Sequence, residues 1–298
     1  MQWKGRRESE NVDDARGRTT AGVGGGNSLG LGLLTLIGRK FGIKGILIAA
    51  VIGIAAWKLG ILDANLLLGD GASYTSQTSA AGPEDQERFD FVKVVLADTE
   101  DVWTSEFQRI GRQYRLPAMT VYRGRVDTAC GTGTADMGPF YCPGDQKIYI
   151  DVGFYDELAQ TFQSPGDFAQ AYVIAHEVGH HVQNLFGDLT RQPAAGETEN
   201  ELSIRVELQA DCYAGIWAAY TATLRDENGQ PVLEPGDIEE ALNAAAQIGD
   251  DAIQRRTQGY IVPETFNHGT SAQRQRWFQA GYQGRTIQSC NTFSARTL

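Results

Sequence analysis

Residues 176–180 read His-Glu-Val-Gly-His, a pattern that suits hydrolysis by a metal-activated water. Two histidines four positions apart on a helix share one face, so their ring nitrogens can both lie about 2 Å from one metal ion. Glu177 follows the first histidine without being a ligand, and its carboxylate can take a proton from a water on the metal. The pattern therefore predicts His176 and His180 as zinc ligands and Glu177 as the general base.

The sequence around this motif also favours a metal-binding helix. Of the four histidines in the chain, three lie within residues 176–181. Apolar residues on both sides fall on one helical face, namely Phe168, Ala171, Tyr172, Ala175, Val178, Val182 and Leu185. A pair of hydrogen-bonded core histidines is the alternative. His181 would lie about 100° from His180 around an ideal helix, so we expect it to have a solvated or capping role and not to share the metal.

A third protein ligand has to come from outside the motif. In one subclass it is a histidine six residues after the second one, with a glycine between them, but those positions are Phe186 and Gln183 here. The next helical segment carries Glu207 and Asp211 on one face, together with small residues that would let two helices approach closely, Ala210, Ala214 and Ala218. We predict that Glu207 is the third ligand and that Asp211 accepts a hydrogen bond from a ligand histidine. The reverse assignment of the two acids is the main alternative.

The remaining histidine, His268, is a candidate for stabilising the oxyanion of the reaction. It lies in an Asn-His-Gly-Thr-Ser segment directly before a predicted helix, from which it could reach the cleft. A hydrogen-bonded surface histidine is an equally simple interpretation. Tyr260 and Tyr282 are weaker candidates for the same role.

The elements that must hold these groups indicate an α+β domain that is rich in helices and has a small sheet. Residues 119–125 and 147–152 are typical of strands, and the second strand could hold an extended peptide by edge pairing. A loop between the strands contains Cys130, several glycines and Cys142. Apolar residues at helical spacing predict helices over about 86–113, 167–186, 200–224, 237–256 and 270–281.

The chain before the domain divides into three parts. Residues 1–43 are polar, glycine-rich and basic, which predicts a disordered segment. Residues 44–62 are apolar apart from lysines near their ends and suffice for a transmembrane helix, which needs about 20 residues. A buried core helix is the alternative for this run. Residues 63–83 are typical of a linker, and residues 84–298 form the predicted folded domain.

The distribution of charge predicts the orientation of the transmembrane helix. Eight Lys or Arg residues precede residue 45, and none occurs between residues 59 and 87. The positive-inside rule then leaves the N-terminus in the cytoplasm and places residues 63–298 in the periplasm or outside a bacterial cell. We favour an uncleaved single-pass anchor over a cleaved signal peptide, because the basic region is unusually long. That compartment permits disulfides, for which Cys130–Cys142 and Cys212–Cys290 are the most natural pairs.

The composition excludes other classes of protein. The formal net charge is −11, so a general basic surface for nucleic acid is not expected. The four cysteines form no CxxC pair, which disfavours a thiolate zinc site or a thioredoxin-type redox motif. The expected partners are a membrane and a peptide or protein substrate, and no nucleic acid.

Further blocks of sequence extend the pattern beyond the zinc motif: Met1–Arg7, Asp98–Trp103, Gly138–Pro143, His176–His181, Val206–Gly215 and His268–Tyr282. With these blocks the sequence resembles the bacterial neutral zinc metallopeptidase family over nearly its whole length. The blocks together are far more specific than the zinc motif alone. The resemblance implies a zincin-like metallopeptidase fold with a single N-terminal anchor, a zinc cofactor, and a glutamate from the next helix as third ligand.

These features predict a zinc-dependent peptidase that hydrolyses peptide bonds by a metal-activated water, with Glu177 as general base. The rival interpretation is a membrane-tethered, non-catalytic zinc-binding or assembly factor, in which protein ligands would fill all four metal positions. Glu177 favours the enzyme, because a purely structural site has no use for a general base.

Overall fold

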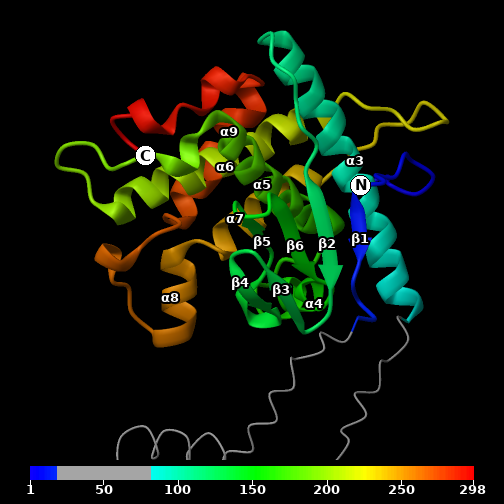
Figure 1. The fold of residues 1–298 in the computed structure, drawn as a ribbon, viewed down its shortest axis with the longest axis horizontal. Helices are drawn as coiled ribbons and strands as arrows, with labels where there is room; N and C mark the ends of the chain where they lie inside the picture. Colours follow the sequence, from blue (N-terminus) through cyan, green and yellow to red (C-terminus); the bar gives the residue numbers. More distant parts are fainter. Residues whose placement is uncertain (19–81) are drawn as a thin grey trace, which may run out of the picture. The chain divides into compact units, whose positions relative to one another are not determined.

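The computed structural model describes residues 1–18 and 82–298 (Figure 1). These residues form one unit, a helix-rich α+β fold with a small sheet, as the sequence predicts. Its helices are α3 (Pro83–Arg109), α4 (Phe154–Gln160), α5 (Asp167–Phe186), α6 (Glu199–Thr221), α7 (Asp237–Gln247), α8 (Asp250–Gln258) and α9 (Ser271–Gly284). Its strands are β1 (Val12–Asp14), β2 (Ala118–Tyr122), β3 (Arg125–Thr128), β4 (Gly131–Thr134), β5 (Phe140–Cys142) and β6 (Lys147–Asp151).

Four of the strands form a sheet in the order β1-β2-β6-β5. β1, β2 and β6 are parallel, and β5 is antiparallel to β6 at one edge. Met119, Val121, Ile148 and Ile150 alternate along the two central strands and are buried in the main core. β5 pairs with β6 at residues 147–149 only, so this part of the predicted peptide-pairing edge at 147–152 is covered, and the rest stays a prediction. β5 forms the edge of the sheet on this side.

Helix α5 lies between the sheet and the paired helices α6 and α9 (Figure 1). α6 and α9 approach so closely that their crossing admits only glycine at two positions. A Cβ on Gly281 would lie 1.8 Å from the carbonyl oxygen of Cys212, and a Cβ on Gly215 would lie 2.0 Å from that of Phe278. This crossing brings the first turns of α9 beside the acidic residues of α6.

The predicted helix over 237–256 is two helices, α7 and α8. They separate at Gly249, where a Cβ would lie 2.4 Å from the backbone nitrogen of Ser271. Asp250 begins α8, and its carboxylate accepts hydrogen bonds from the backbone N–H groups of residues 267–269. The break thus depends on a contact between segments that are distant in sequence, which helical periodicity does not reveal.

Residues 1–18 are folded, so the prediction of a disordered segment over 1–43 is wrong for this part. Met1 is 4% exposed, and β1 adds a strand to the sheet. Arg6 donates two hydrogen bonds of 2.7 Å to Asp98 of α3. Lys4, Arg6 and Arg7 belong to the segment predicted to be disordered, and all three form ion pairs with acids of α3.

Within the part of the chain that the structure describes, no helix is both long and apolar enough to cross a bilayer. The predicted transmembrane helix at 44–62 lies outside the described residues. A single crossing there would separate residues 1–18 from residues 84–298, yet these two parts pack into one unit. The predicted arrangement, with the N-terminus in the cytoplasm and the domain across the membrane, does not account for this packing and stays a prediction.

Both predicted disulfides are present. Cys130–Cys142 joins the turn between β3 and β4 to the end of β5. Cys212–Cys290 joins α6 to the segment that follows α9 and closes a long loop, with a sequence separation of 78. Such a closure restricts the unfolded chain and is expected to stabilise the fold by about 4 kcal/mol.

We predict that a zero-length carbodiimide will cross-link Lys4 to Glu87 in the full-length protein. Lys4 Nζ lies 2.6 Å from Glu87 Oε1, and both side chains are exposed to the reagent. Mass spectrometry after digestion would identify the joined peptides, and Lys4→Gln, which lacks the amine, is the control. Failure to form this cross-link in the folded wild type would contradict the packing of residues 1–18 on α3.

Candidate metal centre

The two helices that carry the predicted site, α5 and α6, are in close contact. At this contact a Cβ on Gly179 would lie 3.0 Å from the Cα and 3.1 Å from the carbonyl oxygen of Ala210. Ala210 is one of the small residues that the sequence analysis identified, and its partner Gly179 lies inside the motif itself. The missing side chain at Gly179 lets the backbones approach, which brings Glu207 within reach of the histidines.

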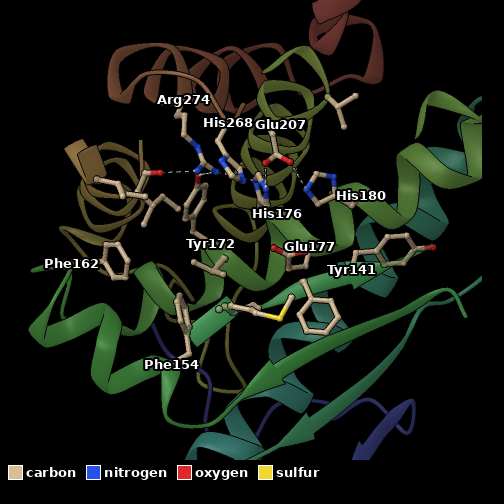
Figure 2. Close-up of a pocket in the computed structure, with 18 of the residues that line it drawn as sticks. Tyr141, Phe154, Phe162, Tyr172, His176, Glu177, His180, Glu207, His268 and Arg274 are labelled. Atoms are coloured by element: carbon tan, nitrogen blue, oxygen red, sulfur yellow. Dashed lines mark hydrogen bonds and ion pairs between the residues drawn. The ribbon is translucent and has the colours of Figure 1, made fainter. Parts of the chain in front are cut away.

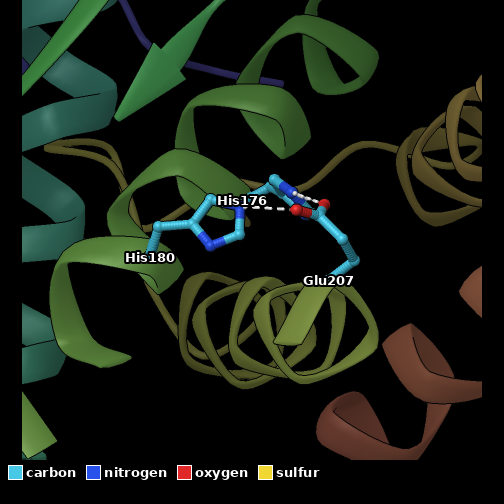
Figure 3. Close-up of side chains that lie close together, drawn as sticks. All are labelled: His176, His180 and Glu207. Atoms are coloured by element: carbon cyan, nitrogen blue, oxygen red, sulfur yellow. Dashed lines mark hydrogen bonds and ion pairs between the residues drawn. The ribbon is translucent and has the colours of Figure 1, made fainter. Parts of the chain in front are cut away.

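His176, His180 and Glu207 point toward one another from these two helices (Figure 3). His176 Nε2 lies 3.2 Å from Glu207 Oε2, and His180 Nε2 lies 3.5 Å from Glu207 Oε1. One ligand atom from each residue lies within 4.8 Å of the other two. The three side chains are mostly buried, with exposed fractions of 7%, 13% and 16%. These three residues, which the sequence predicts as ligands, could hold one metal ion.

The second ring nitrogen of each histidine has a hydrogen-bond partner in the same two helices. His176 Nδ1 lies 2.8 Å from Asp211 Oδ1, and His180 Nδ1 lies 2.8 Å from Gln183 Oε1. An acceptor at Nδ1 favours the tautomer with its hydrogen there, which leaves the lone pair of Nε2 toward the centre. Asp211 thus lies where the sequence predicts it. Gln183 had no predicted role.

The charges around the site suit a divalent cation. With both histidines neutral, as metal binding requires, the formal charges of Glu177, Glu207 and Asp211 exceed that of Arg274 by two negative charges. Burial lowers the pKa of His176, but Asp211 and Glu207 outweigh burial and raise that pKa to about 10. The field that attracts a proton to this ring would also attract a metal cation. Two imidazole nitrogens and one carboxylate oxygen match the ligands of catalytic Zn²⁺ sites.

The three residues open into a cleft of about 670 Å³ (Figure 2). Glu177 lines this cleft beside both histidines and is 7% exposed. Figure 2 shows Phe154 and Phe162 on the Tyr172 side of Glu177, and Tyr141 of β5 on the His180 side. The cleft therefore extends on both sides of the candidate ligands, which an extended chain would need.

His268 lines the same cleft from the segment before α9 (Figure 2). Its Nδ1 lies 3.2 Å from Asp250 Oδ1, which leaves Nε2 to face the cleft. The hydrogen bond to Asp250 raises the pKa of His268. The structure thus brings His268 to the site that the sequence predicts for it. Its partner Asp250 was missed, because the pairing depends on the break between α7 and α8.

Comparison with known proteins agrees with this geometry. Residues 1–293 match the profile of a family described as "Putative neutral zinc metallopeptidase". The chain belongs to this family. Membership implies zinc as the metal for the three converging side chains.

Relatives in this zinc metallopeptidase family are similar along the chain. The uncharacterized protein YpfJ of Escherichia coli strain K12 is 44% identical over 301 residues, which cover 98% of this chain and 99% of YpfJ. The uncharacterized protein Rv2575 of Mycobacterium tuberculosis strain H37Rv is 49% identical over 190 residues, which cover 62% of this chain and 65% of Rv2575. No solved structure matches the chain.

Three further residues considered in the sequence analysis, His181, Tyr260 and Tyr282, are not part of the candidate metal site. His181 does not join the metal group, as expected, but it is 1% exposed, so the expected solvation is wrong. Its Nδ1 lies 3.2 Å from the Tyr141 hydroxyl, and its Nε2 lies 2.7 Å from the carbonyl oxygen of Arg115. Tyr260 is 63% exposed, and neither Tyr260 nor Tyr282 lines the cleft.

We predict that Gly179→Ala weakens zinc binding by roughly tenfold or more, because the added methyl group forces α5 and α6 apart and moves Glu207 from the histidines. Competition with a chromophoric chelator measures this change. Gly17→Ala is the matched control, since a Cβ there meets nothing within 4 Å. Unchanged zinc affinity in Gly179→Ala would show that the helix contact does not set the site.

Proposed function

We propose that this chain is a zinc-dependent peptidase with a zincin-like catalytic domain. The observation that carries the proposal is the convergence of His176, His180 and Glu207 at a cleft that Glu177 also lines. In the proposal these three side chains are the metal ligands and Asp211 fixes the ring of His176. The zincin-like arrangement is supported by α5 lying against a sheet whose edge strand β5 is antiparallel to its neighbour.

When bound at this site, Zn²⁺ lowers the pKa of water to about 7 and polarises a substrate carbonyl. Glu177 takes the proton of the attacking water and later delivers it to the leaving amine nitrogen. His268, as the imidazolium that Asp250 favours, donates from Nε2 to the carbonyl oxygen as negative charge develops there, and Asp250 holds the ring in place. A peptide bound against the apolar side chains of the cleft would displace water from these groups, which would strengthen their electrostatic effect.

The proposed substrate is an extended segment of a peptide or protein. Phe140 and Tyr141 of β5 line the cleft, and β5 is an edge strand of the described sheet, so its backbone can pair with a substrate strand. This edge covers residues 147–149 of the strand that the sequence predicts as the pairing edge. Cys142 ends β5 and is tied to Cys130, which fixes the strand against the hairpin of β3 and β4.

We further propose that the folded unit works in an oxidising compartment, the periplasm or the cell exterior. Its support is that all four cysteines are paired in disulfides, which reducing compartments do not maintain. Because residues 1–18 pack on the domain, the proposal places both on the same side of any membrane that the chain contacts.

We predict that Glu177→Gln retains zinc but loses peptide hydrolysis by roughly 10²- to 10⁴-fold, because an amide cannot accept the proton of the attacking water. Digestion of a peptide library, read by mass spectrometry with a chelator control, measures the loss. Glu157→Gln, a change in another acid that lines the cleft, is the matched control. Full cleavage by Glu177→Gln would refute its role, and absence of cleavage by the zinc-loaded wild type would favour the non-catalytic alternative.

We predict that His268→Ala lowers kcat by roughly 10²- to 10³-fold with little change in zinc affinity, because a donor to the oxyanion is lost. Asp250 raises the pKa of His268, so Asp250→Asn should move the alkaline limb of the kcat/KM profile to lower pH. Measuring kcat and kcat/KM of both variants from about pH 5 to about pH 10 tests the loss of rate and the shift of the alkaline limb. An unchanged rate in His268→Ala would exclude this residue from the reaction.

A further inference from the structure

A buried cation lies beside the candidate metal ligands and has no part in the proposed proton transfers. Arg274, in the first turn of α9, is 3% exposed and lines the cleft. It falls within the shared block His268–Tyr282, where the sequence analysis gave it no role. Burying a guanidinium is costly unless it is paired, so its partners indicate what it does.

The guanidinium of Arg274 donates hydrogen bonds to both oxygens of the Asp211 carboxylate. Its Nε lies 2.9 Å from Asp211 Oδ2, and its Nη2 lies 2.9 Å from Asp211 Oδ1. Its Nη1 donates to the carbonyl oxygen of Ile248 at 3.3 Å, which holds the guanidinium group itself in place. Such paired hydrogen bonds set the plane of the carboxylate as well as its position.

The same carboxylate holds a candidate metal ligand. Asp211 Oδ1 lies 2.8 Å from His176 Nδ1 and also accepts a hydrogen bond from the Tyr172 hydroxyl. Asp211 is fully buried, so water cannot replace a lost partner. If the carboxylate turned, Oδ1 would leave the line of the His176 N–H, and the ring would lose the contact that directs its Nε2 toward Glu207.

We propose that Arg274 is a positioning residue for the metal site: by clamping both oxygens of Asp211, it fixes the ring of His176 for metal binding. The inference rests on the proposed metal site. The interaction is carried across three helices, from α9 through α6 to α5, by the contacts of 2.9 Å and 2.8 Å described above.

A role in charge balance alone predicts the opposite result. Removing the positive charge would leave the site more negative, so a divalent cation would bind more tightly. Restoring the charge with lysine would restore the wild-type affinity. If Arg274 acts through geometry, both glutamine and lysine weaken binding, because a single ammonium group cannot hold the two oxygens in one plane.

The test measures the zinc dissociation constant of Arg274→Gln and Arg274→Lys in the full-length protein, by competition with a chromophoric chelator. We expect the glutamine variant to bind zinc roughly 10- to 100-fold more weakly and the lysine variant to lie between it and the wild type. The visible spectrum of the Co²⁺-loaded protein should change in both variants, because the ligand geometry changes. The melting temperature of the metal-free protein separates these effects from a general loss of stability.

Two controls match the substitutions. Arg276→Gln changes an exposed arginine on the same helix, and Arg6→Lys changes a mostly buried arginine that grips both oxygens of Asp98 elsewhere in the fold. Both controls should bind zinc within about twofold of the wild type. Wild-type affinity and an unchanged Co²⁺ spectrum in Arg274→Lys, or tighter zinc binding by Arg274→Gln, would overturn the inference. Failure of the wild type to bind zinc would instead remove the proposed function itself.

Discussion

The backbones of α5 and α6 meet at Gly179 and Ala210, where a second side chain would fit only if its neighbours gave way by a few tenths of an ångström. A glutamate side chain is short, so Glu207 reaches Nε2 of both histidines only at this separation. The same device recurs where Gly215 and Gly281 let α6 and α9 cross. The site therefore depends on three helices whose backbones lie closer than ordinary side chains allow.

Once the helices are this close, their polar side chains must satisfy one another. Asp211 is fully buried and would be costly without donors, and it finds them on α5 and α9 in His176, Tyr172 and Arg274. The acids of the site exceed its cations, an excess of negative charge that would favour a bound positive ion. A change in the packing of α9 would therefore also change the charges around the candidate metal site, because Arg274 of α9 pairs with Asp211.

The parts of the site that the sequence predicted are those set by local spacing. His176, Glu177 and His180 lie on one helix, and Glu207 and Asp211 repeat that spacing on the next, so their faces could be predicted. Asp250, Gln183 and Arg274 escaped prediction because their partners are set by tertiary packing. Tertiary packing also explains why the sequence predicted α7 and α8 as one helix, since only the contact at Gly249 reveals the break. It likewise explains why β1 was missed, because its short polar sequence is typical of a disordered segment. A membrane helix at 44–62 stays a prediction.

The packing of β1 has a consequence for how the molecule is made. Val12 pairs with Met119, so the first strand leaves the ribosome about a hundred residues before its neighbour in the sheet. Parallel pairing over such a distance raises the contact order, and folding of this kind is slow. Translation of α3 and β2 must finish before the opening residues can dock. The chain is thus expected to stay unfolded long enough for a translocation machinery to handle it before the sheet closes.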